Sequence, residues 1–360
     1  MKNCLVGILM LLILCPFTSL AQEEKAVQTT KNAKLARVHV ISGGGTIMRN
    51  PKNRLEFIRY TQTGETPLTL SQLIERIPEV QQFASVTTES KELRADTTEE
   101  LKALSLLVNS YLKNPEIAGV VFVKGTSTVE DTAYFLNLTI KSDKPVVVTG
   151  SQRPFSTLSS DGPMNLLNAI RVAADPGSKG KGALVVANDE INSAREVTKT
   201  NTYRLETYQS RQMGLLGYAD IDKISYYRVP TRKHTTQTEF DVSQIKSFPR
   251  VDILYAHGGG DAELAKAAVA IGAKGLVIAG LGAGQGNDLK ALKELYDKQG
   301  TRIVRSSRVG DGRVIRDDNW QAPGLIAADS LSPNKSRLLL QLALTKTTDV
   351  DEIQRMFYEY

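Results

Sequence analysis

The sequence predicts an α/β protein with two domains: a large N-terminal domain built on a mainly parallel sheet and a smaller C-terminal α/β domain. Short apolar runs alternate with segments of helical spacing, which is typical of parallel strands buried on both faces. The polar segment 228–250, which contains Pro230 and Pro249, interrupts this alternation and is predicted to link the domains. We therefore expect the N-terminal domain over 35–227 and the C-terminal domain over 251–360, as suits a chain of 360 residues.

Seven runs rich in apolar and β-branched residues are the expected strands. They are Val38–Ser42, Ala118–Val123, Pro145–Thr149, Ala183–Ala187, Asp252–Ala256, Gly275–Ala279 and Arg302–Arg305. Helical spacing is visible in Leu101–Leu107 and over 129–140, and Glu190–Glu196 also has a helical pattern. Because parallel sheets bind ligands beyond the carboxyl ends of their strands, we expect function in the loops that follow these strands.

The first 21 residues are organised like a secretory signal peptide. Lys2 precedes a short apolar segment, and small residues near Ala21 offer a cleavage site. The apolar segment is too short for a comfortable membrane span. Lipid attachment at Cys15 is disfavoured because the bulky Leu14 precedes it where a small residue is usual. We expect residues 1–21 to be removed on export to the periplasm, leaving a flexible tail over 22–34 and no membrane attachment.

Composition narrows the chemistry of the mature chain. Both cysteines, Cys4 and Cys15, lie in the expected signal peptide, so neither a disulfide nor a cysteine metal site is predicted. The histidines His39, His234 and His257 are widely scattered, and no metal centre is expected from them.

Charge and glycine spacing narrow the classes of partner. The segment 1–21 carries one lysine and no acidic residue, so the formal charge falls from +6 to +5 on its removal. That mild, dispersed charge does not favour nucleic-acid binding. The glycines of 280–287, "GLGAGQGN", do not follow the first strand with dinucleotide-binding spacing, so no dinucleotide cofactor is expected.

The first candidate site is the loop after the first expected strand, in "HVISGGGTIMRN". Three glycines precede Thr46, and glycine lets a ligand approach the backbone closely. Thr46 is interpreted either as a helix cap or as an exposed hydroxyl nucleophile at the end of a strand.

A similar junction follows a second expected strand, in "GVVFVKGTSTVEDTAYFLNLTI". Thr126 again follows a glycine, while Thr128 and Asp131 have the spacing of a helix-capping pair. Further on, Lys199 stands among threonines in "VTKTNT". It is either a solvated surface lysine or a partly desolvated base that takes a proton from a hydroxyl.

Seven blocks of the sequence resemble the type II bacterial L-asparaginases in order and spacing. They are "GGGTI", "KGTSTVEDTAYFL", "KPVVVTGSQRP", "SSDGPMNLLNAI", "VTKTNT", "VRSSRVG" and "LLLQLALT". The resemblance covers essentially the whole mature chain. It implies the two-domain asparaginase fold, a homotetramer, and an amidohydrolase that acts with water on a small amide without a cofactor.

The resemblance also implies roles for individual residues. Thr46 matches the nucleophile that forms an acyl-enzyme, and Tyr60, in "RYTQTGE", matches the lid tyrosine that activates it. Thr126 and Lys199 match a threonine–lysine pair that handles protons. Ser90, in "TESKEL", matches a serine that holds the α-carboxylate of the substrate.

Three positions of the substrate site depart from the family's pattern. Ser127 replaces an aspartate that binds the substrate's α-ammonium, Lys124 replaces a histidine, and Lys91 replaces a glutamine. The acidic residue that the family contributes across the dimer is absent from the expected place, although Asp317 or Asp318 could substitute. These changes remove negative charge and are expected to add positive charge near the ammonium position.

Two classes of function follow. One is an asparaginase-type hydrolase, acting on L-asparagine or on a related amide whose amino group is modified or replaced by an acidic function. The other is a non-catalytic protein that binds an acidic amide or a related small molecule on the same scaffold. Retention of all four catalytic matches favours the hydrolase.

Overall fold

The computed structural model describes residues 34–286, 288–316 and 325–360, and Leu35–Tyr360 form one compact unit. The expected signal peptide and nearly all of the expected tail lie outside these residues, as do Asp317 and Asp318. Among the described residues, no helix is both long and apolar enough to span a membrane.

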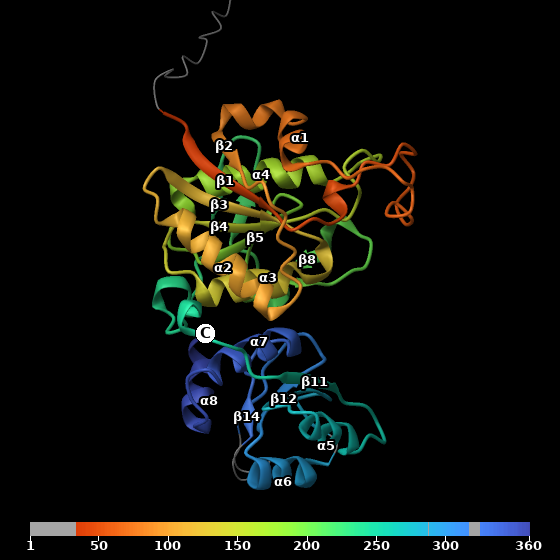
Figure 1. Cartoon of the computed structure of the whole chain (residues 1–360), viewed down its shortest axis with the longest axis vertical. Coiled ribbons are helices and arrows are strands. Elements are labelled where there is room, and N and C mark those ends of the chain that lie inside the picture. Colours follow the sequence, from red (N-terminus) through yellow and green to blue (C-terminus); the bar gives the residue numbers. More distant parts are fainter. Residues whose placement is uncertain (1–33, 287, 317–324) are drawn as a thin grey trace, which may run out of the picture. The chain divides into compact units, whose positions relative to one another are not determined.

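An eight-stranded sheet dominates the N-terminal part of the chain (Figure 1), with the strand order β10-β9-β6-β5-β4-β3-β1-β2. Its parallel strands are β1 (Ala36–Ser42), β2 (Ala84–Thr88), β3 (Ile117–Val123), β4 (Val146–Thr149) and β5 (Ala183–Ala187). Four of these five were expected from their apolar runs, and the prediction is confirmed. The strand β2 was not expected, because its residues alternate between more and less exposed positions at the edge of the sheet.

The strands beyond β5, at the opposite edge of the sheet from β2, pair in antiparallel fashion. They are β6 (Glu190–Ser193), β9 (Gly217–Ala219) and β10 (Ile224–Tyr226). The helix expected over Glu190–Glu196 is therefore wrong: β6 pairs with β5, and its residues Ile191, Asn192 and Ser193 are buried. A separate two-stranded ribbon joins β7 (Thr198–Lys199) to β8 (Tyr208–Gln209).

Helices cover both faces of the large sheet. On β3, Val120 and Phe122 pack into one hydrophobic cluster, while Val121 and Val123 pack into a second. The first cluster includes α2 (Thr98–Leu112) and α3 (Val129–Thr139), and the second includes α1 (Leu70–Glu75) and α4 (Gly162–Ala174). Two of the three expected helical segments are confirmed: Leu101–Leu107 lies within α2, and 129–140 matches α3 to within one residue. Burial on both faces explains why the strands read as continuous apolar runs.

The C-terminal part contains a four-stranded parallel sheet in the order β11-β12-β13-β14. Its strands are β11 (Val251–Tyr255), β12 (Gly275–Gly280), β13 (Arg302–Ser307) and β14 (Ile326–Ala327). The helices are α5 (Glu263–Ala270), α6 (Leu289–Gln299), α7 (Pro333–Ala343) and α8 (Val350–Glu359). The three expected strands of this sheet are confirmed.

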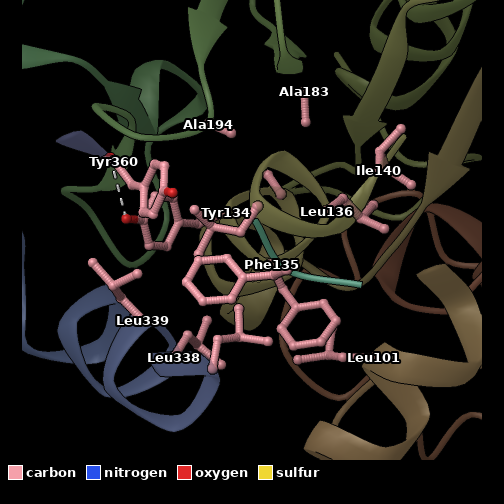
Figure 2. Packing of buried hydrophobic residues seen from close by; sticks show 14 of the residues in the cluster. Leu101, Tyr134, Phe135, Leu136, Ile140, Ala183, Ala194, Leu338, Leu339 and Tyr360 are labelled. Atoms are coloured by element: carbon pink, nitrogen blue, oxygen red, sulfur yellow. Dashed lines mark hydrogen bonds between the residues drawn. The ribbon is translucent and has the colours of Figure 1, made fainter. Parts of the chain in front are cut away.

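The larger hydrophobic cluster joins helices that are far apart in sequence. Figure 2 shows Tyr134 and Phe135 of α3 among Leu338 and Leu339 of α7, and all four side chains are fully buried. The Tyr134 hydroxyl donates to the main-chain oxygen of Tyr360 at 3.3 Å. This packing fixes α3, whose first turn directly follows the loop after β3.

Candidate active site

Thr46 lies just beyond the carboxyl end of β1. Gly44 and Gly45 have φ values of 75° and 105°, a backbone region that favours glycine. Thr46 is the first residue of a short 3-10 turn, and the cap position of that turn is occupied by Gly45. Thr46 Oγ1 and the Tyr60 hydroxyl form a hydrogen bond of 2.9 Å. The interpretation of Thr46 as a helix cap is therefore wrong, and its hydroxyl is left for chemistry.

The segment that carries Tyr60 is held against residues 153–158. The Leu158 N–H donates to the Arg54 carbonyl at 3.0 Å, and the Ser156 hydroxyl donates to the Pro51 carbonyl at 2.9 Å. The guanidinium of Arg153 lies 5.3 Å from the centre of the Phe57 ring. These contacts tether the residues that precede Tyr60, whose hydroxyl lies at Thr46.

The loop after β3 touches the loop after β1. A Cβ built on Gly45 would collide with the main-chain N and Cα of Gly125. The two parallel strands β1 and β3 are paired neighbours, so their carboxyl ends meet at one edge of the sheet. This backbone contact brings Thr126, the residue after Gly125, to the same site as Thr46.

Lys199 and Thr126 form the second hydroxyl pair. Lys199 Nζ donates to Thr126 Oγ1 at 2.8 Å and to Gln152 Oε1 at 2.6 Å. Burial lowers the pKa of the Lys199 amine, while the charge of Asp161 acts in the opposite direction. Lys199 is half-buried at a hydroxyl, so the interpretation as a solvated surface lysine is wrong.

Four neighbours of this pair were missed at the sequence level. Tyr208 donates through its hydroxyl to the Thr126 carbonyl at 2.9 Å, and Glu130 Oε1 accepts the Lys199 N–H at 3.3 Å. Gln152 contacts Lys199, and the Asp161 carboxylate accepts the Gln152 N–H at 2.9 Å. Gln152 and Asp161 belong to the blocks "TGSQRP" and "SSDGP", where such a polar run after a strand is the signal that could have found them.

Ser90 and Lys91 lie directly after β2, the edge neighbour of β1. Glu89 Oε1 accepts hydrogen bonds from the Ser90 N–H at 2.8 Å and from its hydroxyl at 3.3 Å. Tyr111 donates to the other Glu89 oxygen at 2.6 Å, and that bond is the main reason why the pKa of Glu89 is lowered. Ser90, Lys91 and Ser127 are all exposed, as a group that meets a soluble substrate must be.

Lys124 does not add a free charge to the substrate site, so that expectation is wrong. Its side chain is 2% exposed, and Nζ donates to the carbonyls of Arg94 and Ala95 at 2.5 and 2.8 Å and to Asp96 Oδ1 at 3.0 Å. Burial lowers the pKa of this amine, and Asp96 opposes the shift. Three acceptors use the three N–H bonds of the ammonium.

The expected capping pair of Thr128 and Asp131 is not formed. The Thr128 side chain makes no cap hydrogen bond at the start of α3. Asp131 Oδ1 instead accepts from Asn334 Nδ2 at 3.3 Å, and burial raises the pKa of the Asp131 carboxyl. Asp131 therefore ties α3 to α7.

The arrangement can carry out nucleophilic chemistry. Two hydroxyls lie in touching loops, and each is hydrogen-bonded to a group that can exchange a proton. A hydroxyl is a weak nucleophile that needs such a partner, and a lowered pKa makes an amine a more available proton acceptor. Main-chain N–H groups of the glycine loop can stabilise an oxyanion.

Family models match both parts of the chain. The model described as "Asparaginase, N-terminal" matches residues 37–232. The model described as "Glutaminase/Asparaginase C-terminal domain" matches residues 250–357.

Individual proteins match over most of their length. The chain is 42% identical over 348 residues to L-asparaginase 2 of Bacillus subtilis (strain 168), covering 94% of this chain and 91% of that protein. It is 38% identical over 340 residues to a probable periplasmic L-asparaginase of Haemophilus influenzae, covering 93% and 96%. The crystal structure of a probable cytoplasmic L-asparaginase from Campylobacter jejuni matches with a TM-score of 0.82 and 38% identity, covering 90% of this chain and 100% of that one.

Proposed function

The chain belongs to the asparaginase family and is an asparaginase-type amidohydrolase, and from this premise we propose that Thr46 is the nucleophile that forms an acyl-enzyme with the substrate. The observation that carries the proposal is the 2.9 Å hydrogen bond between Thr46 Oγ1 and the Tyr60 hydroxyl. It gives a hydroxyl on a glycine loop a neighbour that can take up its proton.

The reaction has two steps. In the first, Thr46 Oγ1 bonds to the amide carbon and its proton passes to Tyr60, while the Tyr60 hydroxyl passes its own proton on toward the leaving nitrogen. The carbon–nitrogen bond breaks, and the protonated nitrogen departs as ammonia. In the second, water adds to the ester carbon and the carbon–oxygen bond to Thr46 breaks, which returns one proton of the water to Oγ1. The product leaves as a carboxylate after its other proton passes to solvent or to the ammonia. The pair formed by Thr126 and Lys199 supplies and accepts protons beside the reacting atoms.

Substrate recognition is assigned to Ser90, Lys91 and Ser127. Ser90 offers a hydroxyl to the substrate's α-carboxylate, and Lys91 adds a positive charge near the position of the α-ammonium. Ser127 offers a neutral hydroxyl where an ammonium would gain more from a carboxylate. L-asparagine is the first substrate to test, and an amide with a modified or acidic group in place of the amino group is the second.

A non-catalytic binding protein is the other class considered. Such a protein needs contacts to a ligand but no base at a hydroxyl. Here both hydroxyls have a proton partner, Tyr60 at Thr46 and Lys199 at Thr126. This pairing favours the hydrolase.

Ammonia release separates these possibilities. Purified mature protein would be incubated with L-asparagine, L-glutamine, N-acylated asparagine and acidic amides, and acyl-Thr46 would be sought by mass spectrometry after rapid acid quenching. A covalent adduct on Thr46 with any amide supports the proposal. Turnover that leaves the covalent adduct on a residue other than Thr46 contradicts it.

We also propose that the protein is exported to the periplasm and works as a homotetramer. The signal-like segment 1–21 supports export, while the family includes relatives named as periplasmic and as cytoplasmic. N-terminal sequencing of the native protein should find a start near Gln22, and light scattering should give four times the chain mass. A retained Met1 would contradict export.

A further inference from the structure

Gln152 lies between the Lys199 amine and a neighbouring loop. Its amide oxygen accepts from Lys199 Nζ at 2.6 Å, opposite the 2.8 Å bond from Nζ to Thr126 Oγ1. The amine is thus held between one neutral carbonyl oxygen and the hydroxyl that it serves. This contact joins residues 47 positions apart in the chain.

The orientation of the Gln152 amide is set from its other end. The amide nitrogen lies within hydrogen-bond distance of three main-chain carbonyls, those of Asn201 at 3.4 Å, Thr202 at 3.2 Å and Arg204 at 3.1 Å. Carbonyl oxygens accept but do not donate, so the nitrogen must face them and the oxygen must face Lys199.

The main chain of Gln152 is also fixed. The Asp161 carboxylate accepts the Gln152 N–H at 2.9 Å and the Arg153 N–H at 3.0 Å. The side chain of Asn165 donates to the same carboxylate at 3.1 Å. Gln152 is therefore anchored at its backbone and at its amide nitrogen, which leaves one fixed direction for its oxygen.

We propose that Gln152 is a positioning residue of the amidohydrolase reaction, whose amide oxygen aims the Lys199 amine at Thr126 without placing a negative charge beside it. The inference rests on the proposed role of Lys199 as a proton acceptor. A neutral acceptor matters because a carboxylate at the same place would hold the proton on Lys199 and oppose its transfer.

The other charged and titratable groups around Lys199 do not mask the effect of Gln152 on its amine. Asp161 raises the pKa of Lys199, against the larger lowering by burial. Glu130 contacts the Lys199 main-chain N–H, and its other oxygen is 4.0 Å from the buried Lys335 amine. Tyr208 donates to a carbonyl, and burial raises its pKa well above the ordinary value. Besides the Thr126 hydroxyl that the amine serves, Gln152 is the neutral group that contacts Nζ directly.

The test compares two substitutions with opposite electrostatic effects. Gln152→Glu puts a carboxylate at Lys199 Nζ, so the pH at which activity appears should rise by about one unit or more, since an opposite charge at this range shifts a pKa by roughly 1–3 units. Gln152→Met removes the acceptor, so nothing at this position opposes the lowering of the Lys199 pKa by burial. The acidic limb of the pH–activity profile should then move to lower pH. Both variants should lose about tenfold or more in kcat, because Met no longer aims the amine and Glu holds the proton on it.

Controls separate positioning from folding and from the proposed mechanism. Gln354 bridges the Ala327 N–H and carbonyl in a buried site of the C-terminal sheet, so Gln354→Met should lower the melting temperature without moving the pH profile. Lys199→Met should abolish turnover. If it does so while both Gln152 variants keep the wild-type limb, or move it in one direction, the role of Gln152 is overturned and the role of Lys199 stands. If Lys199→Met retains turnover, both are overturned.

Discussion

The backbones of Gly45 and Gly125 meet so closely that a Cβ on Gly45 has no room. This contact joins the loop that ends in Thr46 to the loop that presents Thr126. Each hydroxyl has its own partner, Tyr60 or Lys199. The two pairs can act on one substrate because the two loops lie this close, and Gly45 is the residue that permits it.

Gly45→Ala tests this contact. The added Cβ would collide with Gly125 in a backbone conformation of φ 105°, so the loops must separate. We expect activity to fall at least a hundredfold and stability to fall by about 1–3 kcal/mol. Gly180→Ala is the matched control, because Gly180 has φ 72° but nothing within 4 Å of its Cβ position. An active Gly45→Ala enzyme would show that the loop contact is dispensable.

Thr46→Ala tests the nucleophile. It removes Oγ1 but leaves the pair of Lys199 and Thr126 in place, so turnover should vanish while the melting temperature stays near that of the wild type. Thr46→Ser keeps a hydroxyl and should retain measurable ammonia release. More than a few per cent of residual activity in the alanine variant would remove Thr46 from the role.

Lys124→Met tests whether this buried lysine is structural. The substitution leaves the carbonyls of Arg94 and Ala95 and the Asp96 carboxylate without their donor. We expect a loss of about 1–3 kcal/mol in the free energy of unfolding, measured by urea titration. The ranking of substrates should not change. A changed ranking would place the Lys124 charge in the substrate site after all.

Much of the fold follows from local pattern, because the central strands are buried on both faces. Val120 to Val123 read as one apolar run for this reason. The antiparallel edge was harder to predict, since Ile191 to Ser193 include buried polar residues whose hydrogen bonds come from distant parts of the chain. Asn192, for example, accepts from Ser210 at 2.6 Å.

The candidate site, like the fold, could be predicted only in part from the sequence. The roles assigned to Thr46, Tyr60, Thr126 and Lys199 came from the resemblance of their motifs, and the structure brings them into two hydrogen-bonded pairs. The directions of long side chains could not be predicted. Lys124 turns into the protein through contacts with acceptors about 30 residues earlier, a long-range choice that motif spacing does not encode.

Ser127→Asp tests the basis of substrate choice. L-asparagine carries an α-ammonium, and a serine hydroxyl gives it no negative charge. If this position controls specificity, the aspartate should raise kcat/KM for L-asparagine at least tenfold, which corresponds to about 1.4 kcal/mol of transition-state binding. Ser71→Asp, at an exposed serine in α1, adds the same charge elsewhere and should leave kcat/KM unchanged.

Lys91→Gln in the Ser127→Asp background carries this test further. Removing the lysine takes a positive charge away from the ammonium, so kcat/KM for L-asparagine should rise again. The two gains should not simply add, because both side chains would act on one charge. Steady-state ammonia release measures each variant, and circular dichroism checks its fold. A folded double variant whose asparagine rate is unchanged or lower would mean that another group holds the ammonium, and Asp317 and Asp318 would be the next positions to substitute.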